Sequence, residues 1–553
     1  MDHFNELAGL TIPALLRRRA ITLRFKLALS APSHRGYRDR LTYGQLVHRM
    51  TTMGRSLRAR DVNAGDRVAL FLANTAVREG VLTALGCWEI GAIVAPLNVR
   101  ASDDELSFAL DLIAPAVIVA EDADVARLRR LAAAARVWCL SGGKDVTPGA
   151  ERWPDPQDGG AGASAASSAT PSDRVDGPAA YVVPDPEAPS VLLFTSGTTA
   201  RAKAVVHTQR SQLHAGLAVG GAIGLTEADT YQGAWPLFTS SVLNMACMSS
   251  WVYGAGVVLE ENTLDNAARL RLIAAEATSV YHGVTSPLHF MIDEYARGGY
   301  DLTCLRRLGY GGAVMPVEVI EKFRRHLPWV DQVHIWGMTE TGPAGTFLPP
   351  WYLPRKAGCI GQPMPGCAVR IVDDETGAPM ASGGTGEIAF AGPSAALGYY
   401  RNPEATAQTF VDGWVRTGDI GRIDDEGHLH FVDRKKDIIN RGGLKVASAA
   451  VEEVLYRDPR LKEAAVIAVA HPGLGEDVAA CVVAREGTQL DLQVLAQLCA
   501  DHLADYACPR QWFVLPALPK NPMGKILKRE LRDMIVTETP WRIDVAPRRP
   551  GST

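Results

Sequence analysis

The segment from Thr195 to Lys203 contains the residue types that a polyphosphate site needs. It follows the apolar run Val191–Phe194, which predicts a buried strand. Hydroxyl side chains lie on both sides of Gly197, and Lys203 ends the segment. Hydroxyls and backbone N–H groups donate to phosphate oxygens, glycine admits a close backbone approach, and lysine adds a positive charge. Taken alone, the segment fits a polar turn between a strand and a helix equally well.

The spacing of the segment separates it from the nucleotide loop of the common NTPases. That loop has the order Gly-x4-Gly-Lys-Ser/Thr, which is missing here. A phosphate-binding role therefore has to be supported by residues elsewhere in the chain.

Further segments downstream carry groups of the same kind. They are Tyr310–Ala313, Trp336–Thr341, Gly386–Ile388, Thr417–Asp419, Asp433–Asp437 and Pro519–Lys525. In this order and at these separations the chain resembles the adenylate-forming superfamily, which includes acyl- and aryl-CoA synthetases, luciferases and the adenylation domains of peptide synthetases. The resemblance extends from about Leu41 to Leu531.

The elements that must position these segments alternate along the chain. Asp66–Leu72 and Ile93–Leu97 read as strands, and Ala76–Ile90 between them reads as a helix. Such alternation predicts an α/β fold with layered, mainly parallel sheets. The resemblance implies a large N-terminal α/β domain with a small β-subdomain, followed by a mobile α+β lid. We expect an adenylation core at 1–435, β-rich over 361–435, and a lid at 436–553 with its hinge at Lys436.

Two stretches fall outside this pattern. Residues 142–189 are rich in Gly, Ala, Ser, Pro and Asp, and contain few large apolar residues, so we expect a flexible surface insertion. Residues 540–553 are rich in Pro and Arg and predict a disordered tail.

Composition excludes several classes of protein. A net charge of −4 over 553 residues gives no bulk attraction to nucleic acid or to an anionic membrane. The nine cysteines include no CxxC pair, so we expect small buried thiols rather than a zinc site. No apolar run has membrane-spanning length, and Arg24 and Lys26 interrupt the apolar N-terminal segment, which argues against an export signal. A cytoplasmic enzyme is the prediction.

The resemblance assigns the first polar segment to the triphosphate of ATP. The residues that match are Thr195, Ser196, Gly197, Thr198, Thr199 and Lys203. Ala200, Ala202 and Ala204 stand where glycine, proline and glycine are usual in the family. Because alanine resists positive φ, the tip of the loop is expected to be stiffer or differently shaped.

The resemblance also assigns a base site and a metal site. Glu340 matches the residue that helps to hold Mg²⁺, and Thr339 matches a contact to the α-phosphate; a carboxylate next to phosphates requires such a cation. In isolation this Thr-Glu pair would read as a helix cap. The adenine contacts implied are Gly311, Gly312, Ala313, Trp336 and Gly337.

The C-terminal third is expected to supply the remaining nucleotide contacts. Asp419 and Arg434 match the two ribose contacts, although a turn aspartate and a surface arginine would look the same. Lys525 matches the lysine essential for adenylation, since a compact movable charge can meet both a carboxylate and a phosphate. Gly442 and Gly443 match the face that guides the pantetheine arm of coenzyme A.

The acid pocket is predicted from one further segment. Amino-acid-activating relatives place an aspartate after the phenylalanine of Pro236-Leu237-Phe238, and here Thr239 follows. A buried ammonium without a counter-charge is strongly disfavoured, so an α-amino acid is not expected. The predicted wall is small or apolar and comprises Phe238, Thr239, Gly283, Val284, Gly309, Met338 and Ala344. This wall favours a hydrophobic acid, bulky ones included, such as a cyclic, terpenoid, aryl or medium-chain fatty acid.

The resulting prediction is an AMP-forming acid–thiol ligase that uses ATP, Mg²⁺ and coenzyme A. The acid becomes an acyl-adenylate with release of pyrophosphate, and CoA then displaces AMP. Ser448 and Ala450 replace the usual proline and glutamate near the CoA face, so transfer to a carrier protein, an amine or a partner enzyme is the alternative. A luciferase-like monooxygenase stays open, as does a homodimer. A non-catalytic binding protein is disfavoured because Glu340, Asp419, Arg434 and Lys525 are all retained.

Overall fold

The structure is a computed structural model and divides into two compact units. Unit 1 comprises residues 1–369 and 390–415, and unit 2 comprises residues 370–389 and 416–553. The predicted boundary at Lys436 falls inside unit 2, so the hinge stays a prediction. The residues that the structure describes are 7, 9–140, 147–156, 184–195, 202–261, 263–312, 315, 317–374, 376–521, 525–535 and 541–542.

One sheet of unit 1 contains the strand that leads into the polar segment. Its strand order is β19-β9-β8-β4-β3-β5-β6-β7. The pairs from β8 to β7 are parallel, whereas β8–β9 and β9–β19 are antiparallel. The bounds are β3 (Arg67–Phe71), β4 (Ile93–Pro96), β5 (Val117–Ala120), β6 (Arg136–Cys139), β7 (Glu151–Arg152), β8 (Pro189–Thr195), β9 (Lys203–Thr208) and β19 (Gly398–Tyr399).

A second sheet of unit 1 carries the residues predicted for adenine and for the acid. Within this unit its order is β16-β15-β14-β13-β12-β10-β11-β1-β2. The strands from β14 to β1 are parallel, and β15, β16 and β2 are antiparallel additions. The bounds are β1 (Leu27–Pro32), β2 (Arg38–Thr42), β10 (Thr230–Gly233), β11 (Gly256–Leu259), β12 (Val280–Val284), β13 (Arg307–Gly311), β14 (Asp331–Gly337), β15 (Gly345–Leu348) and β16 (Cys359–Pro363).

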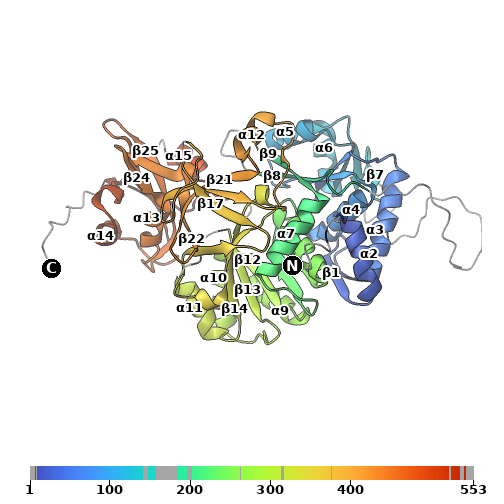
Figure 1. Cartoon of the computed structure of the whole chain (residues 1–553), viewed down its shortest axis with the longest axis horizontal. Helices are drawn as coiled ribbons and strands as arrows, with labels where there is room; N and C mark the ends of the chain where they lie inside the picture. Colours follow the sequence, from blue (N-terminus) through green and yellow to red (C-terminus); the bar gives the residue numbers. More distant parts are fainter. Residues whose placement is uncertain are drawn as a thin grey trace, which may run out of the picture. The chain divides into compact units, whose positions relative to one another are not determined.

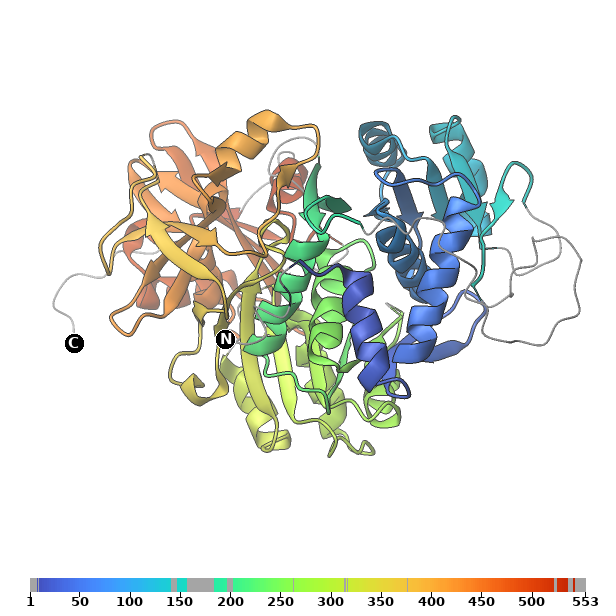
Figure 2. The same cartoon turned by 45° about the vertical axis from the view of Figure 1, so that its right-hand side comes forward.

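Helices cover these sheets, and several begin where the sequence provides a cap. Thr42 and Gln45 form a capping box at the start of α3, and Ser102 and Glu105 do so at α5. Helices α2, α3 and α4 lie side by side, as Figures 1 and 2 show in blue. The helices of unit 1 are α2 (Ile12–Thr22), α3 (Tyr43–Arg58), α4 (Val77–Ile90), α5 (Asp103–Ile113), α6 (Val125–Leu131), α7 (Gln209–Ala222), α8 (Met248–Tyr253), α9 (Asn266–Ala275), α10 (Thr285–Ala296), α11 (Val317–His326) and α12 (Pro403–Thr409).

Separate apolar cores support the two sheets of unit 1. Strands β3 to β6 pack their Val, Ile and Ala side chains against α5 and α6. Helices α9, α10 and α11 pack on β12 and β13 through residues such as Leu288 and Phe323. Burial of these apolar faces holds the polar strand ends in place.

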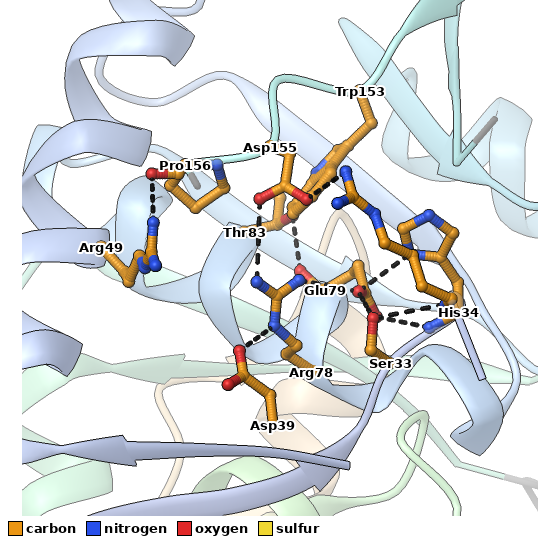
Figure 3. Close-up of polar contacts among 11 residues, drawn as sticks. Ser33, His34, Asp39, Arg49, Arg78, Glu79, Thr83, Trp153, Asp155 and Pro156 are labelled. Carbon is orange, nitrogen blue, oxygen red and sulfur yellow. Dashed lines mark hydrogen bonds and ion pairs between the residues drawn. The ribbon is translucent and has the colours of Figure 1, made fainter. Parts of the chain in front are cut away.

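Part of the predicted flexible insertion is packed instead. Glu151–Arg152 form β7, and Trp153 is buried with its indole N–H donating to Thr83 Oγ1 at 3.0 Å. Asp155 lies 2.9 Å from an Arg35 nitrogen, and Figure 3 shows it facing the buried Arg78. The buried Trp153 and the buried pair Arg78–Asp155 order this part. The low apolar content of residues 142–189 as a whole gave no sign of it. Residues 142–146 and 157–183 lie outside the described residues.

Over its described residues, unit 2 contains two groups of strands with three α-helices. The first group is ordered β17-β18-β21-β22, and the second β24-β23-β26-β27-β28 with β25 paired to β26. The strands are β17 (Ala368–Val372), β18 (Thr385–Ala391), β21 (Trp414–Ile423), β22 (Leu429–Arg434), β23 (Ile438–Arg441), β24 (Leu444–Ala447), β25 (Leu461–His471), β26 (Gly475–Ala484), β27 (Gln511–Val514) and β28 (Trp541–Arg542). The helices are α13 (Ser448–Leu455), α14 (Leu492–His502) and α15 (Lys528–Ile535).

Two details of unit 2 depend on strand pairing. Leu444–Ala447 pair with β23, so helix α13 begins only at Ser448. Trp541 and Arg542, within the predicted tail, pair with β27; the rest of 540–553 lies outside the described residues.

Two observations concern membranes and thiols. Among the helices in the described ranges, none combines the length and apolarity needed to cross a bilayer. All nine cysteines are free thiols, and seven of them are buried.

Candidate active site

Four parallel strands of unit 1 end at the same edge of a sheet. Strands β10, β12, β13 and β14 are successive parallel neighbours, so their carboxyl ends lie together. Ligands of α/β sheets bind outside such ends. The carboxyl ends of these strands and the segments that follow them contain the predicted residues Phe238, Thr239, Gly283, Val284, Gly311, Gly312, Trp336, Gly337, Met338, Thr339 and Glu340.

Two glycines at this edge are required by the close approach of neighbouring backbones. A Cβ at Gly311 would lie 2.4 Å from the carbonyl oxygen of Ile335, and one at Gly337 would lie 2.0 Å from that of Pro343. Gly312 has φ of +80°, which side-chain-bearing residues rarely adopt. Close backbone packing therefore requires glycine at Gly311, and positive φ favours it at Gly312; their contact with adenine stays a prediction. Ala313 lies outside the described residues.

Three polar side chains of unit 1 form a connected group. Thr195 and Lys203 pair across β8 and β9. The Lys203 ammonium lies 4.7 Å from the ring centroid of Tyr399, within cation–π range. The Tyr399 hydroxyl donates to Glu340 Oε1 at 2.8 Å, and Glu340 is buried. Lys203 and Glu340, assigned separately from sequence, thus share one neighbour. The four loop residues Ser196, Gly197, Thr198 and Thr199 lie outside the described residues.

A buried histidine supports the backbone of the Thr339–Glu340 turn. His207 Nε2 lies 2.7 Å from the carbonyl oxygen of Thr339, to which it donates, and Nδ1 lies 3.2 Å from Ser211 Oγ. Burial lowers the pKa of His207 to about 4, so the ring is neutral at physiological pH. The neutral ring can donate to the Thr339 carbonyl through Nε2 and accept from the serine through Nδ1.

The residues of the predicted acid wall carry no charge, and a histidine packs over one of them, Gly309. The space above Gly309 is filled by His282, because a Cβ at Gly309 would lie 3.1 Å from His282 Cγ. His282 Nδ1 lies 2.8 Å from the Tyr231 hydroxyl, and burial lowers the His282 pKa to about 3, with His334 adding to the shift. His282 therefore packs directly over Gly309, and the place of Gly309 in the acid wall stays a prediction.

The other wall residues lie near the strand ends. The Thr239 hydroxyl donates to the carbonyl oxygen of Pro236 at 2.8 Å, which leaves its methyl group as the apolar part of the side chain. Ala344 is buried directly before β15, and its carbonyl accepts the Thr341 hydroxyl at 2.5 Å.

Unit 2 brings the predicted ribose pair together. Asp419 and Arg434 are opposite one another on β21 and β22, with Arg434 Nε 3.2 Å from Asp419 Oδ1. Glu387, from the Gly386–Ile388 segment, accepts the Gly418 N–H at 3.0 Å and so fixes the turn that precedes Asp419. Asp419 is buried, which suits a carboxylate that accepts from paired hydroxyls.

Lys525 and Lys436 lie close enough to Asp419 and Arg434 for these charges to affect their pKa values. Burial of the ammonium lowers the pKa of Lys525 to about 8; Arg434 and Lys436 lower it further, and Asp419 and Asp437 oppose the shift. The Lys525 residue as a whole still has exposed surface. Burial also lowers the pKa of Lys436, which lies in the turn Lys435–Asp437.

The predicted CoA face begins at a tight hairpin. Gly442 and Gly443 join β23 to β24 with φ of +59° and +89°, as a two-residue turn requires. Both glycines are exposed. Ser448 is buried, whereas Ala450 is exposed.

Sequence reasoning missed three residues of this site. Tyr399, His207 and His282 each lie outside the quoted motifs, and each acts through a partner distant in sequence. The available signal was a tyrosine or histidine within an apolar strand, which needs a polar partner when buried.

The fold and the residues at the strand ends define an adenylate-forming enzyme. Residues 20–400 match the family model described as AMP-binding enzyme, and residues 450–525 match that described as AMP-binding enzyme C-terminal domain. The chain belongs to the AMP-binding enzyme family.

The similarity to known proteins extends over nearly the whole chain. A feruloyl-CoA synthase from Amycolatopsis sp is 31% identical over 498 residues, covering 89% of this chain and 93% of the relative. The crystal structure of ATP-bound MatB from Rhodopseudomonas palustris has a TM-score of 0.81 at 26% identity, covering 96% of this chain and 99% of that one. The amide bond synthetase McbA from Marinactinospora thermotolerans has a TM-score of 0.79 at 27% identity, covering 95% and 99%.

Proposed function

We propose that the protein is an AMP-forming acid–CoA ligase for a hydrophobic carboxylic acid. Its first half-reaction joins the carboxylate to the α-phosphate of ATP and releases pyrophosphate. In its second half-reaction the thiol of CoA attacks the acyl carbon and AMP leaves. The similarity to a CoA synthase and to an ATP-bound structure supports this assignment.

One observation carries the proposal: Lys203, Tyr399 and Glu340 form a connected group beside Thr339. A carboxylate and a polyphosphate repel one another, so a site that joins them must supply positive charge and donors. We assign Lys203 to the triphosphate and the Thr339 hydroxyl to the α-phosphate. His207 fixes the Thr339 carbonyl, and therefore the direction of the turn that carries Thr339 and Glu340.

Glu340 has the donor chemistry that Mg²⁺ prefers. It is a buried carboxylate whose Oε1 accepts from the Tyr399 hydroxyl, and carboxylate oxygens are ligands that Mg²⁺ prefers. We assign it as the protein ligand of a Mg²⁺ ion, which would offset phosphate charge.

The residues of unit 2 complete the assignment. Asp419 and Arg434 are the ribose contacts. Lys525 is the cation shared by the carboxylate and the α-phosphate during adenylation. Its lowered pKa leaves a protonated fraction at pH 7 that is sufficient for this role.

The acid is proposed to be apolar over most of its surface. The side chains of Tyr231, Trp235 and His282 form a buried, uncharged aromatic cluster, with the Trp235 and His282 rings edge-to-face at 5.6 Å. No carboxylate stands at Thr239 to receive an ammonium. Aryl and cyclic acids suit uncharged aromatic surroundings of this kind, whereas short polar acids such as acetate or malonate do not.

A second acceptor class follows from the similarity to an amide bond synthetase. An amine could attack the same acyl-adenylate, with loss of AMP, and would not need the CoA face near Gly442 and Gly443. We retain CoA as the first choice because the family match covers the C-terminal domain as well as the core. The free thiols agree with a reducing compartment, so we place the reaction in the cytoplasm.

The test uses purified protein, Mg·ATP and a panel of aryl, cyclic, medium-chain and short acids. Each reaction is run with CoA, with an amine, and with neither, and pyrophosphate, acyl-AMP, acyl-CoA and amide are measured. Acyl-CoA from hydrophobic acids supports the proposal. Pyrophosphate and acyl-AMP without acyl-CoA would replace CoA by another acceptor. Turnover of acetate or malonate alone would overturn the proposed acid class.

A further inference from the structure

Lys528, three residues after Lys525, is held by a buried polar network. Its ammonium lies 2.7 Å from Glu452 Oε1 and donates to Ser448 Oγ at 2.5 Å. The Ser448 hydroxyl donates in turn to Asp433 Oδ2 at 2.7 Å. Ser448 is 0% exposed and Asp433 3% exposed, so these bonds form away from solvent.

The network joins three elements of unit 2. Asp433 is near the end of β22, Ser448 is the first residue of α13, and Lys528 is the first residue of α15; Figure 1 labels all three elements. Ser448 is the only one of these residues that both donates and accepts within the network. Its hydroxyl therefore connects the start of α15 to the strand that carries Arg434.

Asp433 links the network to the predicted ribose pair. Its Oδ1 accepts the backbone N–H of Arg434 at 2.7 Å, while Oδ2 accepts Ser448 and, at 3.3 Å, the N–H of Ala449. Arg434 then contacts Asp419. The path from Lys528 to Asp419 thus runs through hydrogen bonds and ion pairs of described residues.

Electrostatics explain why Lys525 needs this restraint. Its ammonium is close enough to feel two cations, Arg434 and Lys436, and two carboxylates, Asp419 and Asp437. It also loses hydration, and this is the larger cause of its lowered pKa. Lys525 is itself exposed, so its position depends on the segment that carries it. The short segment from Lys525 to Lys528 restricts its movement because α15 is fixed by buried Leu531 and Ile535.

The side chain at position 448 determines whether Lys528 and Asp433 are bridged by a hydroxyl. Proline, the residue usual at this position in the family that the chain resembles, has no hydroxyl and cannot bridge Lys528 to Asp433. Alanine would leave the Asp433 carboxylate and the Lys528 ammonium without their shared partner. Threonine retains the hydroxyl, which makes it the conservative replacement.

We propose that Ser448 and Lys528 are positioning residues for adenylation: their buried bridge to Asp433 holds the Lys525 segment beside the Asp419–Arg434 pair. The inference rests on the proposed function for its catalytic consequence. It concerns the first half-reaction, and it assigns a role to the serine that replaces proline.

The first test measures both half-reactions in S448A, S448T and K528M. In S448A the kcat for pyrophosphate release should fall about tenfold, as expected for loss of a neutral hydroxyl that is hydrogen-bonded to charged partners, while KM for ATP changes less than twofold. Thioester formation from supplied acyl-AMP and CoA should stay within twofold of wild type. S448T should restore adenylation. K462M, at an exposed lysine of the same unit, is the matched control for K528M.

The second test does not depend on activity. Competitive labelling of lysines with acetic anhydride over a pH series, read by peptide mass spectrometry, gives the pKa of Lys525 directly. In S448A it should rise from about 8 by one unit or more, because the freed ammonium regains water. S448T should leave it unchanged.

The outcomes separate this inference from the proposed function. If the wild-type enzyme forms no acyl-adenylate from any acid, the proposed function is wrong. The Lys525 pKa in S448A would then still test whether Ser448 restrains the Lys525 segment. An unchanged Lys525 pKa in folded S448A, or equal loss of both half-reactions, would overturn the positioning role.

Discussion

Replacing Tyr399 by phenylalanine tests the central group of unit 1 at a single atom. The Tyr399 hydroxyl is the donor to Glu340 Oε1 at 2.8 Å, and both residues are buried. The variant Y399F retains the ring that Lys203 approaches to 4.7 Å, so only the hydrogen bond is removed. If Glu340 orients the nucleotide, the variant should weaken adenylation without disturbing the fold.

The expected loss of activity follows from the negative charge on Glu340, the acceptor of this hydrogen bond. A hydrogen bond to an ionised group contributes about 1.5–3 kcal/mol. At about 1.4 kcal/mol for each factor of ten, kcat/KM for Mg·ATP should fall about ten- to a hundredfold. Because the carboxylate is also the proposed Mg²⁺ ligand, the Mg²⁺ concentration needed for half-maximal rate should rise.

The assay is pyrophosphate release at varied ATP and Mg²⁺ with one accepted acid. The matched control is Y400F, because Tyr400 is the adjacent tyrosine and is half-buried. Its kcat/KM should stay within about twofold of wild type. A Y399F enzyme with the same kcat/KM and the same Mg²⁺ dependence as Y400F would refute the proposed link between Tyr399 and Glu340.

Three further predictions concern unit 2 and the buried charges of Figure 3. The variant K525A should abolish acyl-AMP synthesis yet leave thioester formation from supplied acyl-AMP largely intact, and equal loss of both steps would show that the lysine is misassigned. Because Lys525 acts as a cation and burial, followed by Arg434, lowers its pKa to about 8, the adenylation rate should decline as pH rises through about 8; a rate that persists to pH 10 contradicts this. Arg78 is fully buried between Glu79 and Asp39, so R78M should lower the free energy of unfolding by about 3–5 kcal/mol in urea, whereas R58M at an exposed arginine should change it by less than about 0.5 kcal/mol.

Much of the fold could be predicted because it depends on local patterns. The apolar run Asp66–Leu72 and the periodic stretch Ala76–Ile90 became β3 and α4 within a residue or two. The start of α13 does not follow from local pattern, because Leu444–Ala447 lead directly into the helix and only pairing with β23 makes them a strand. Trp153 was missed for a similar reason, since one residue in a polar stretch does not change its average composition.

The order and spacing of the polar segments determined the family, the α/β class and the residue types available for adenylation. Those properties are encoded locally, in short runs with their own turn chemistry. Tertiary structure alone decided which side chains meet: Tyr399 with Glu340 across 59 residues, His207 with Thr339 across 132, and Ser448 with Lys528 across 80. Such pairs leave no periodic signature in the sequence, because they form only when sheet register and helix packing bring distant elements to hydrogen-bonding distance.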